Sequence, residues 1–423
     1  STSYNTGWMH GDIKGAFLSD TDDTDVTAGT ELWPEGDFAD ANEWPSAGAQ
    51  WIISGGTATV NYTGGGYSFL GSSTGTLTNG KKYILSFTVS NYSSGRLEAS
   101  QANSSNIPIG FSANGSYTQL ITYTGTTGSG LGMYAYGGGT VNFTLDNLFL
   151  RELEEEDRSV NNTGLTVYGT ITKTPVALGA DLVAYSGFSA SNYLLQPHNS
   201  SLEFGTGSFS CTVWFKSSTA DVSNYKGLVY LNRNGILGEG FQILLGPSNG
   251  IYLYIYGPTN DFSGTYHTGY NDGNWHQISV SSTGTHQRVY LDGVLKETGN
   301  ITTGSITDTS SELFIGKWYG NTSSPFYWRG SIALCRISAS IPSPEQIKKI
   351  YEDEKVLFQE NAKATLYGSS DAVTALAYYD STNLLYAGTS SGRSDFQGLR
   401  RINNTTTAVT TAISASNGLV AEQ

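Results

Sequence analysis

Along most of its 423 residues, the chain alternates between short apolar runs and clusters of Gly, Asn, Asp and Ser. Short runs bounded by turn residues at this spacing are typical of antiparallel β-sandwiches. A chain of this length has room for about two to four domains. We therefore predict an all-β protein made of tandem antiparallel β-sandwich jelly rolls, with one helix in the C-terminal region and a short terminal β segment.

Changes in composition divide the chain into six segments. Residues 1–30 form a polar leader, whose Trp8 and Phe17 we expect to be exposed and to dock on another body. Residues 154–164 begin with four carboxylates, which should repel each other and stay solvated as an acidic linker. The other predicted segments are a first jelly roll (31–153), a second jelly roll (165–341), a helix (342–360) and a terminal β segment (361–423).

The predicted helix has a complete set of start signals. Ser343 can cap it, Pro344 suits the first helical position, and Gln346 completes a capping box. Its apolar stripe must lie against a sheet or a partner. The segment after it contains a hairpin pattern, and since a two-stranded hairpin is marginal alone, it needs neighbours from this chain or from copies of it.

Five motifs in order resemble laminin-G-like, concanavalin A-like jelly rolls, over about residues 165–352. They are SFSCTVWFK (208–216), NWHQISV (274–280), RVYLDGV (288–294), ELFIG (312–316) and GSIALCRI (330–337). Where this family carries acidic residues in its closing strand, this chain has Ala333, Leu334 and Cys335. The motif therefore does not support a calcium site, and we expect no cofactor.

Three stretches of the first block are similar to carbohydrate-binding-module jelly rolls of the galactose-binding type: ELWPEGDF (31–38), WIISGGTA (51–58) and LDNLFLRE (145–152). Residues 388–399 (GTSSGRSDFQGL) are similar to one blade of a β-propeller. The order of these parts resembles virion appendage or tail-associated proteins of marine bacteriophages. The resemblance implies a location on the virion surface or outside the cell.

Cys211 and Cys335 are the two cysteines, and both lie in apolar strand-like runs. They are either buried, inert thiols or a pair close enough for a disulfide. The concanavalin A-like resemblance places their strands next to each other. Neither alternative amounts to a disulfide framework or a metal site.

Composition and charge exclude several partners. The net charge of −14, with no basic stripe, disfavours nucleic acid. No stretch approaches 18 consecutive apolar residues, so no membrane span is expected, and the first residues show no signal peptide. Charged residues are only 14%, and a surface of hydroxyls, amides and tyrosines suits sugar contact, although it also suits any β-rich protein.

Catalytic patterns are missing from the sequence. No strand carries the alternating acids of a concanavalin A-like glycosidase, and no nucleophile elbow, P-loop or HExxH motif occurs. The five histidines have no metal-ligand spacing. We therefore predict no catalytic residues, no metal site and no enzyme.

The clearest binding candidates are tyrosines at alternate positions. In GIYLYIYG (250–257), Tyr252, Tyr254 and Tyr256 share one strand face, while aliphatic residues occupy the other. Such a row can stack sugars, meet another subunit, or act only as a cross-strand ladder. Tyr134 and Tyr136 form a smaller version in the first block.

These observations favour a non-enzymatic virion fibre, appendage or decoration protein. Its expected partners are a host-surface polysaccharide or glycan, other virion proteins and further copies of itself in a homo-oligomer. The alternatives are a purely structural filament or surface-layer subunit and, less favoured, a polysaccharide-degrading enzyme.

Overall fold

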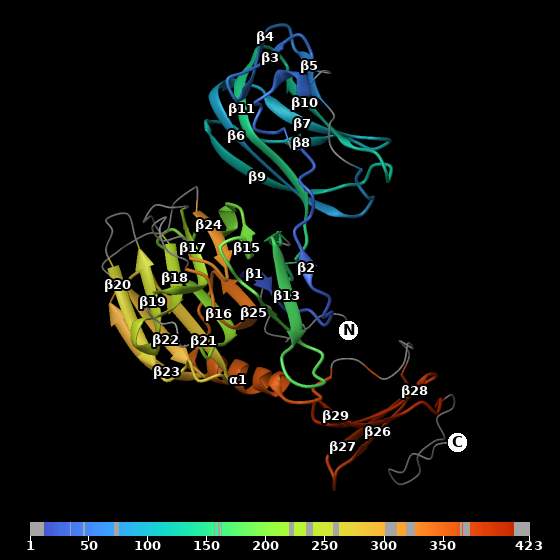
Figure 1. The fold of residues 1–423 in the computed structure, drawn as a ribbon, viewed down its shortest axis with the longest axis vertical. Coiled ribbons are helices and arrows are strands. Elements are labelled where there is room, and N and C mark those ends of the chain that lie inside the picture. Colours follow the sequence, from blue (N-terminus) through green and yellow to red (C-terminus); the bar gives the residue numbers. More distant parts are fainter. Residues whose placement is uncertain are drawn as a thin grey trace.

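A computed structural model of the chain shows a mostly β protein with several antiparallel sheets and a single α-helix among its described residues, which confirms the predicted fold class (Figure 1). The structure describes residues 12–33, 35–44, 47–71, 76–155, 157–159, 161, 163–219, 224–233, 240–256, 262–300, 311–318, 326–363, 366 and 373–409. Three bodies are visible: a first sandwich, a second sandwich below it, and a C-terminal sheet beside the helix.

The first sandwich packs a five-stranded sheet against a four-stranded sheet. Alternate residues of each strand enter one core, which includes Trp51, Phe87 and Phe143. The five-stranded sheet has the order β3 (Trp51–Ser54), β4 (Thr57–Tyr62), β11 (Val141–Glu152), β6 (Lys82–Ser94), β9 (Gly115–Thr122). The four-stranded sheet has the order β5 (Gly66–Gly71), β10 (Leu131–Gly137), β7 (Arg96–Gln101), β8 (Ile107–Ile109).

The second sandwich packs a nine-stranded sheet against a seven-stranded sheet. The larger sheet has the order β2 (Val26–Thr27), β13 (Thr170–Pro175), β14 (Val183–Ser186), β25 (Ser331–Ser338), β16 (Phe209–Lys216), β21 (Trp275–Ser282), β22 (His286–Leu291), β23 (Val294–Asn300), with β1 (Ile13–Phe17) also paired to β25. The smaller sheet has the order β12 (Thr166–Tyr168), β15 (Tyr193–Gln196), β24 (Ser311–Ile315), β17 (Lys226–Arg233), β18 (Gly240–Gly246), β19 (Gly250–Tyr256), β20 (Phe262–Thr268).

Helix α1 (Pro344–Glu354) covers the outer face of the nine-stranded sheet. It starts with the capping box between Ser343 and Gln346, and its last residue, Glu354, is buried. The Glu354 carboxylate accepts a hydrogen bond from Trp214 Nε1 at 2.8 Å and pairs with Arg336 Nη2 at 2.5 Å. Because the helix covers this outer face, β16 is buried on both sides, including its outward-facing Ser210, Thr212 and Trp214.

The leader docks on the second sandwich as two of its strands, so it is not the separate segment that was predicted. Its strand β1 pairs antiparallel with β25, with Phe17 opposite Cys335, and β2 pairs with β13. Phe17, expected to be exposed, is buried in the core of the second sandwich. Trp8 lies outside the described residues. The leader is therefore part of the second sandwich, and the first sandwich is inserted between β2 and β12.

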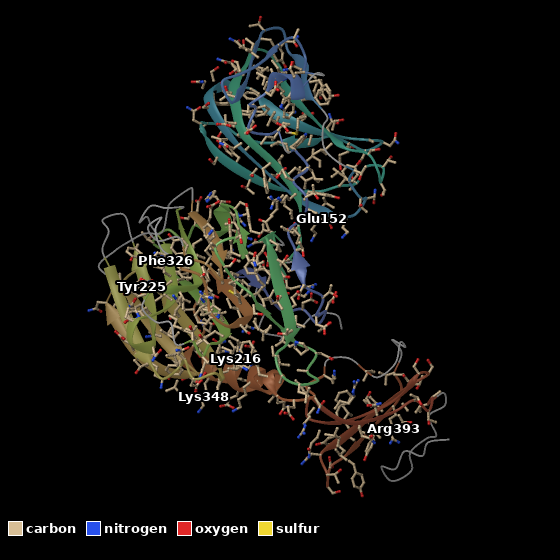
Figure 2. The ribbon with its side chains drawn as sticks, viewed as in Figure 1. Glu152, Lys216, Tyr225, Phe326, Lys348 and Arg393 are labelled. Atoms are coloured by element: carbon tan, nitrogen blue, oxygen red, sulfur yellow. The ribbon has the colours of Figure 1, made fainter. Side chains whose placement is uncertain are left out.

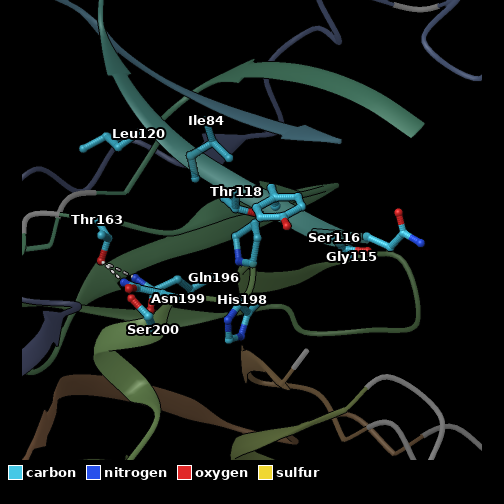
Figure 3. A pocket seen from close by; sticks show the side chains of 13 residues that line it. Ile84, Gly115, Ser116, Thr118, Leu120, Thr163, Gln196, His198, Asn199 and Ser200 are labelled. Atoms are coloured by element: carbon cyan, nitrogen blue, oxygen red, sulfur yellow. Dashed lines mark hydrogen bonds between the residues drawn. The ribbon is translucent and has the colours of Figure 1, made fainter. Parts of the chain in front are cut away.

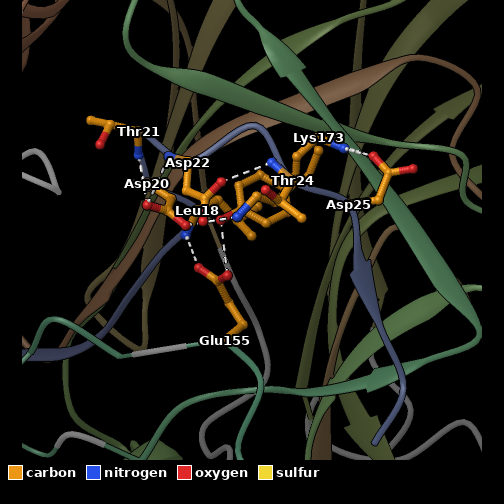
Figure 4. A network of polar contacts seen from close by, with 9 residues as sticks. Leu18, Asp20, Thr21, Asp22, Thr24, Asp25, Glu155 and Lys173 are labelled. Atoms are coloured by element: carbon orange, nitrogen blue, oxygen red, sulfur yellow. Dashed lines mark hydrogen bonds and ion pairs between the residues drawn. The ribbon is translucent and has the colours of Figure 1, made fainter.

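The predicted acidic linker is also not solvated, because the leader supplies donors to its carboxylates (Figure 4). Glu155 is buried and accepts hydrogen bonds from Leu18 N at 3.3 Å and from the Tyr185 hydroxyl at 2.8 Å. Asp157, also buried, accepts from Ala16 N at 2.9 Å. The expectation of solvated repulsion was wrong, since N–H and O–H groups from distant parts of the chain hydrogen-bond these buried carboxyl groups.

The C-terminal sheet is larger than the predicted hairpin. It is a four-stranded meander in the order β26 (Val373–Tyr379), β27 (Leu384–Thr389), β28 (Gly392–Gln397), β29 (Arg400–Thr405). Leu376 and Tyr378 are exposed on β26 and have Ala387 and Leu385 as their β27 partners. Of its strand residues, only Ala387 and Phe396 are buried apolar side chains, so this sheet has almost no core of its own.

Candidate functional site

Strand β19 has the two faces that its alternation predicts. Ile251, Leu253 and Ile255 enter the core of the second sandwich. Tyr252, Tyr254 and Tyr256 therefore point to the opposite, outer face of the seven-stranded sheet, and neighbouring rings along it lie 5.8 and 6.4 Å apart.

The central tyrosine of this row is not free to bind a ligand. Tyr254 is only 8% exposed, because the ring of Tyr225 packs against it and the two hydroxyls hydrogen-bond at 2.9 Å. Burial, followed by the bond to Tyr225, raises the pKa of Tyr254 well above its usual value. Tyr252 and Tyr256 are half-buried.

The row continues into a larger aromatic cluster. Trp318 packs edge-on against Tyr225, with ring centroids 5.7 Å apart, and against Phe326, with centroids 4.4 Å apart. Figure 2 places Tyr225 and Phe326 close together at the side of the second sandwich. We name this set the Tyr254 cluster: Tyr225, Tyr252, Tyr254, Tyr256, Trp318 and Phe326. Its mutual packing resembles a stabilising cross-strand ladder more than an open platform.

The tyrosines of the first sandwich are more accessible. Tyr134 and Tyr136 alternate on β10 with Met133 and Ala135, which are buried in the core. The neighbouring strand β5 adds Tyr67, whose ring lies 4.4 Å from that of Tyr136 and 5.9 Å from that of Tyr134. Tyr67 is 56% exposed, so an aromatic ring faces solvent on the outer side of the four-stranded sheet.

A charged pair borders these rings. Arg96 on β7 lies over the Tyr136 ring at 4.5 Å and donates to Glu98 Oε1 at 2.6 Å through Nη2. Glu98 is only 4% exposed, and its other oxygen accepts from Asn106 Nδ2 at 3.3 Å. Burial alone would raise the pKa of Glu98, but hydrogen bonds from Arg96 and Asn106 hold it below the usual value.

We call this surface the Tyr67 face: Tyr67, Phe69, Tyr134, Tyr136, Arg96 and Glu98. The sequence reading found only its two β10 tyrosines. Cross-strand pairing in the four-stranded sheet places the remaining side chains beside them, because Tyr134 pairs with Glu98 and Tyr136 with both Tyr67 and Arg96. An exposed ring next to fixed donors and acceptors can stack on a flat ligand and hydrogen-bond its hydroxyl groups.

Cys211 and Cys335 are both free and fully buried in the core of the second sandwich. Burial, with a hydrogen bond to Cys335, raises the pKa of the Cys211 thiol well above its usual value. Of the two alternatives, the structure has the buried thiol pair. Within the described residues, no group of three or more His, Cys, Asp or Glu side chains is arranged to hold a metal ion.

Residues 188–348 match the profile of a family described as the concanavalin A-like lectin/glucanases superfamily. Over those residues, the second sandwich has a concanavalin A-like fold. This confirms, over those residues, the resemblance found in the strand motifs. No curated protein sequence matches the chain. No helix in the described part of the chain is long and apolar enough to span a membrane.

Solved structures with a similar arrangement include receptor-binding domains of clostridial toxins. That of botulinum neurotoxin C/D mosaic serotype is 15% identical, with a TM-score of 0.38, and the match covers 59% of this chain and 62% of that one. The binding domain of Paraclostridial Mosquitocidal Protein 1 is 13% identical, with a TM-score of 0.41, and the match covers 64% and 65%. This chain therefore spans less than two thirds of either domain, and so distant a likeness says nothing about ligands.

Proposed function

We propose that this protein is a non-enzymatic virion surface protein that binds host-surface glycans through the Tyr67 face. The observation that carries the proposal is an exposed tyrosine ring beside a buried, hydrogen-bonded carboxylate and its arginine partner. Sugars present an apolar face and a rim of hydroxyls, so they match a ring flanked by fixed donors and acceptors. The concanavalin A-like lectin fold of the second sandwich supports a binding role for the chain.

The same geometry supports binding over catalysis. Glycoside hydrolysis requires two carboxyl groups about 5–9.5 Å apart, one of them protonated as an acid. Glu98 has a lowered pKa and is bonded to Arg96 and Asn106, so it is suited to accept hydrogen bonds and unsuited to donate a proton.

A glycan array and a host-cell binding assay on the purified chain test the proposal, with Tyr67→Ala as the variant. Stacking that covers roughly 60 Å² of apolar ring at ~25 cal/mol per Å² contributes about 1.5 kcal/mol, so we expect about a tenfold loss of affinity. Ile52→Ala is the matched control, since Ile52 is an exposed apolar residue on the other sheet of the same sandwich. Equal binding by both variants would refute the assignment of the Tyr67 face.

The second candidate function is a structural filament or surface-layer subunit. The exposed apolar residues of the C-terminal sheet favour it, because a sheet with few buried side chains gains stability from a second copy. Leu376→Asp separates the two functions by analytical ultracentrifugation. The structural role would be favoured if the parent chain forms a homo-oligomer that Leu376→Asp abolishes, and if the parent chain binds no glycan.

A further inference from the structure

A cleft lies between the two sandwiches, on the opposite side of the first sandwich from the Tyr67 face. Its volume is about 650 Å³, within the range of small-molecule sites. Figure 3 shows side chains from both sandwiches around it. The first sandwich contributes Ile84, Leu120 and residues 114–118, and the second contributes Thr163 and residues 196–200.

The apolar lining of the cleft comes from the outer face of the five-stranded sheet. Ile84 on β6 pairs with Leu120 on β9. Ile84 lies between Tyr83 and Leu85, which enter the core of the first sandwich, and it does not belong to that core itself. Because Ile84 is itself only 2% exposed, the half-buried Leu120 supplies the apolar surface that a ligand can reach on this side.

The wall from the second sandwich is held in place by hydrogen bonds. Gln196 Nε2 donates to Thr163 Oγ1 at 2.6 Å and to Gly164 O at 3.1 Å, while Asn199 Nδ2 donates to the same Thr163 oxygen at 3.2 Å. His198 is fixed by Glu203 at 3.0 Å. Gln196 is only 2% exposed, and its Oε1 accepts no hydrogen bond within the described structure.

The lining selects a class of ligand by its chemistry. It contains amides, hydroxyls and the rings of Tyr117 and Pro197, and its one ionisable side chain besides Tyr117 is His198. The one charged partner beside the lining, Glu203, already faces His198, so an ionic ligand would find no uncompensated opposite charge there. An apolar ligand would leave Gln196 Oε1 buried without a donor. A ligand with many uncharged hydroxyls satisfies both donors and acceptors.

We propose that this cleft is a second saccharide site, specific for neutral sugars and contacted by both sandwiches. The inference rests on the proposed glycan-binding function but concerns a different surface, so each can fail separately. A sugar bound here contacts β9 on one side and residues 196–200 on the other.

The experiment uses the full chain with maltotriose, cellotriose and chitotriose as neutral probes and sialyllactose as the anionic one. Titration calorimetry measures affinity, and hydrogen exchange locates the contact. Ser200→Trp places a large ring at the exposed edge of the cleft, and Ser54→Trp makes the same change at an exposed position away from it. We expect a neutral trisaccharide to slow exchange at residues 114–118 and 196–200, and Ser200→Trp to weaken its binding at least tenfold.

The outcomes separate the two sites. Slowed exchange that persists in Tyr67→Ala and disappears in Ser200→Trp, with Ser54→Trp unchanged, supports the cleft. Binding that is abolished by Tyr67→Ala, or that is unchanged in Ser200→Trp, overturns the cleft site. Either result remains consistent with binding at the Tyr67 face. A preference for sialyllactose at residues 114–118 and 196–200 overturns the neutral class. Absence of binding by every probe overturns the cleft as a neutral-sugar site, while the Tyr67 face is decided by the glycan array.

Discussion

The buried carboxylate of Glu155 makes the stability of the second sandwich depend on pH. Burial raises the pKa of Glu155 from a usual value near 4.5 to about 7. The neighbouring Asp20 raises it further, while the Tyr185 hydroxyl and Lys173 lower it. The folded protein therefore holds a proton on Glu155 at pH values where the unfolded chain has lost it. Stability should be highest below about pH 4.5 for this group and should fall as pH rises through 7.

The size of the effect follows from the difference between the two pKa values. At about 1.4 kcal/mol for each pKa unit, a rise of about 2.5 corresponds to about 3.5 kcal/mol of unfolding free energy. Glu155→Gln keeps the shape and an acceptor for Leu18 N but cannot ionise. Because the parent chain has already lost part of this at pH 5, the variant should gain about 2.5 kcal/mol relative to the parent chain between pH 5 and pH 8.5.

Urea unfolding from pH 5 to 8.5 measures this, read by hydrogen exchange mass spectrometry so that each sandwich is followed separately. Burial also raises the pKa of Glu312 to about 7, which gives a slope of the same sign. Glu312→Gln is therefore the matched background in which the Glu155 substitution is compared. If Glu155→Gln leaves the pH slope of peptides from β1 and β25 unchanged, the assigned role of Glu155 is wrong.

Three further predictions concern the second sandwich. Glu354→Ala removes the carboxylate that pairs with the buried Arg336, so it should lower the free energy of unfolding by about 3–5 kcal/mol. A decrease of less than about 1 kcal/mol in a urea titration would show that this ion pair does not stabilise the position of α1. Phe17→Ala should cost about 3–5 kcal/mol in the second sandwich alone, and an unaffected second sandwich would contradict its dependence on the leader. Cys211 and Cys335 should resist a thiol reagent in the native protein and react after unfolding; rapid native labelling would argue against their burial.

Where a structural signal is local, the sequence was a good guide. The motifs at 208–216 and 330–337 correspond to β16 and β25, because each is a continuous run with turn residues at its ends. The helix start at Ser343 needs only residues three positions apart. The alternation in 250–257 likewise placed its tyrosines on one face of β19.

Where the deciding contact is distant, the same reasoning failed. The leader pairs with a strand more than 300 residues further along the chain, and no local pattern indicates that partner. Glu155 was predicted to be solvated because carboxylates surround it in the sequence, although Leu18 and Tyr185 form its hydrogen bonds in the fold. Tyr254 is covered by Tyr225, which lies outside β19, the strand of Tyr254. A cross-strand map would have been needed to group Tyr67 with Tyr136.

Because the first sandwich is inserted into the second, its orientation is restrained before a ligand binds between them. A module on a single linker can rotate, and binding must then restrict that motion at an entropic cost. Here the chain passes between the sandwiches twice, and Glu154 joins both passages by accepting from Gly29 N at 2.6 Å and Val167 N at 3.1 Å. Arg151 of the first sandwich also lies over the Tyr168 ring of the second, 5.2 Å from its centroid. These contacts hold both walls of the cleft in place before a ligand arrives, so a sugar there has less ordering to impose than in a freely jointed pair.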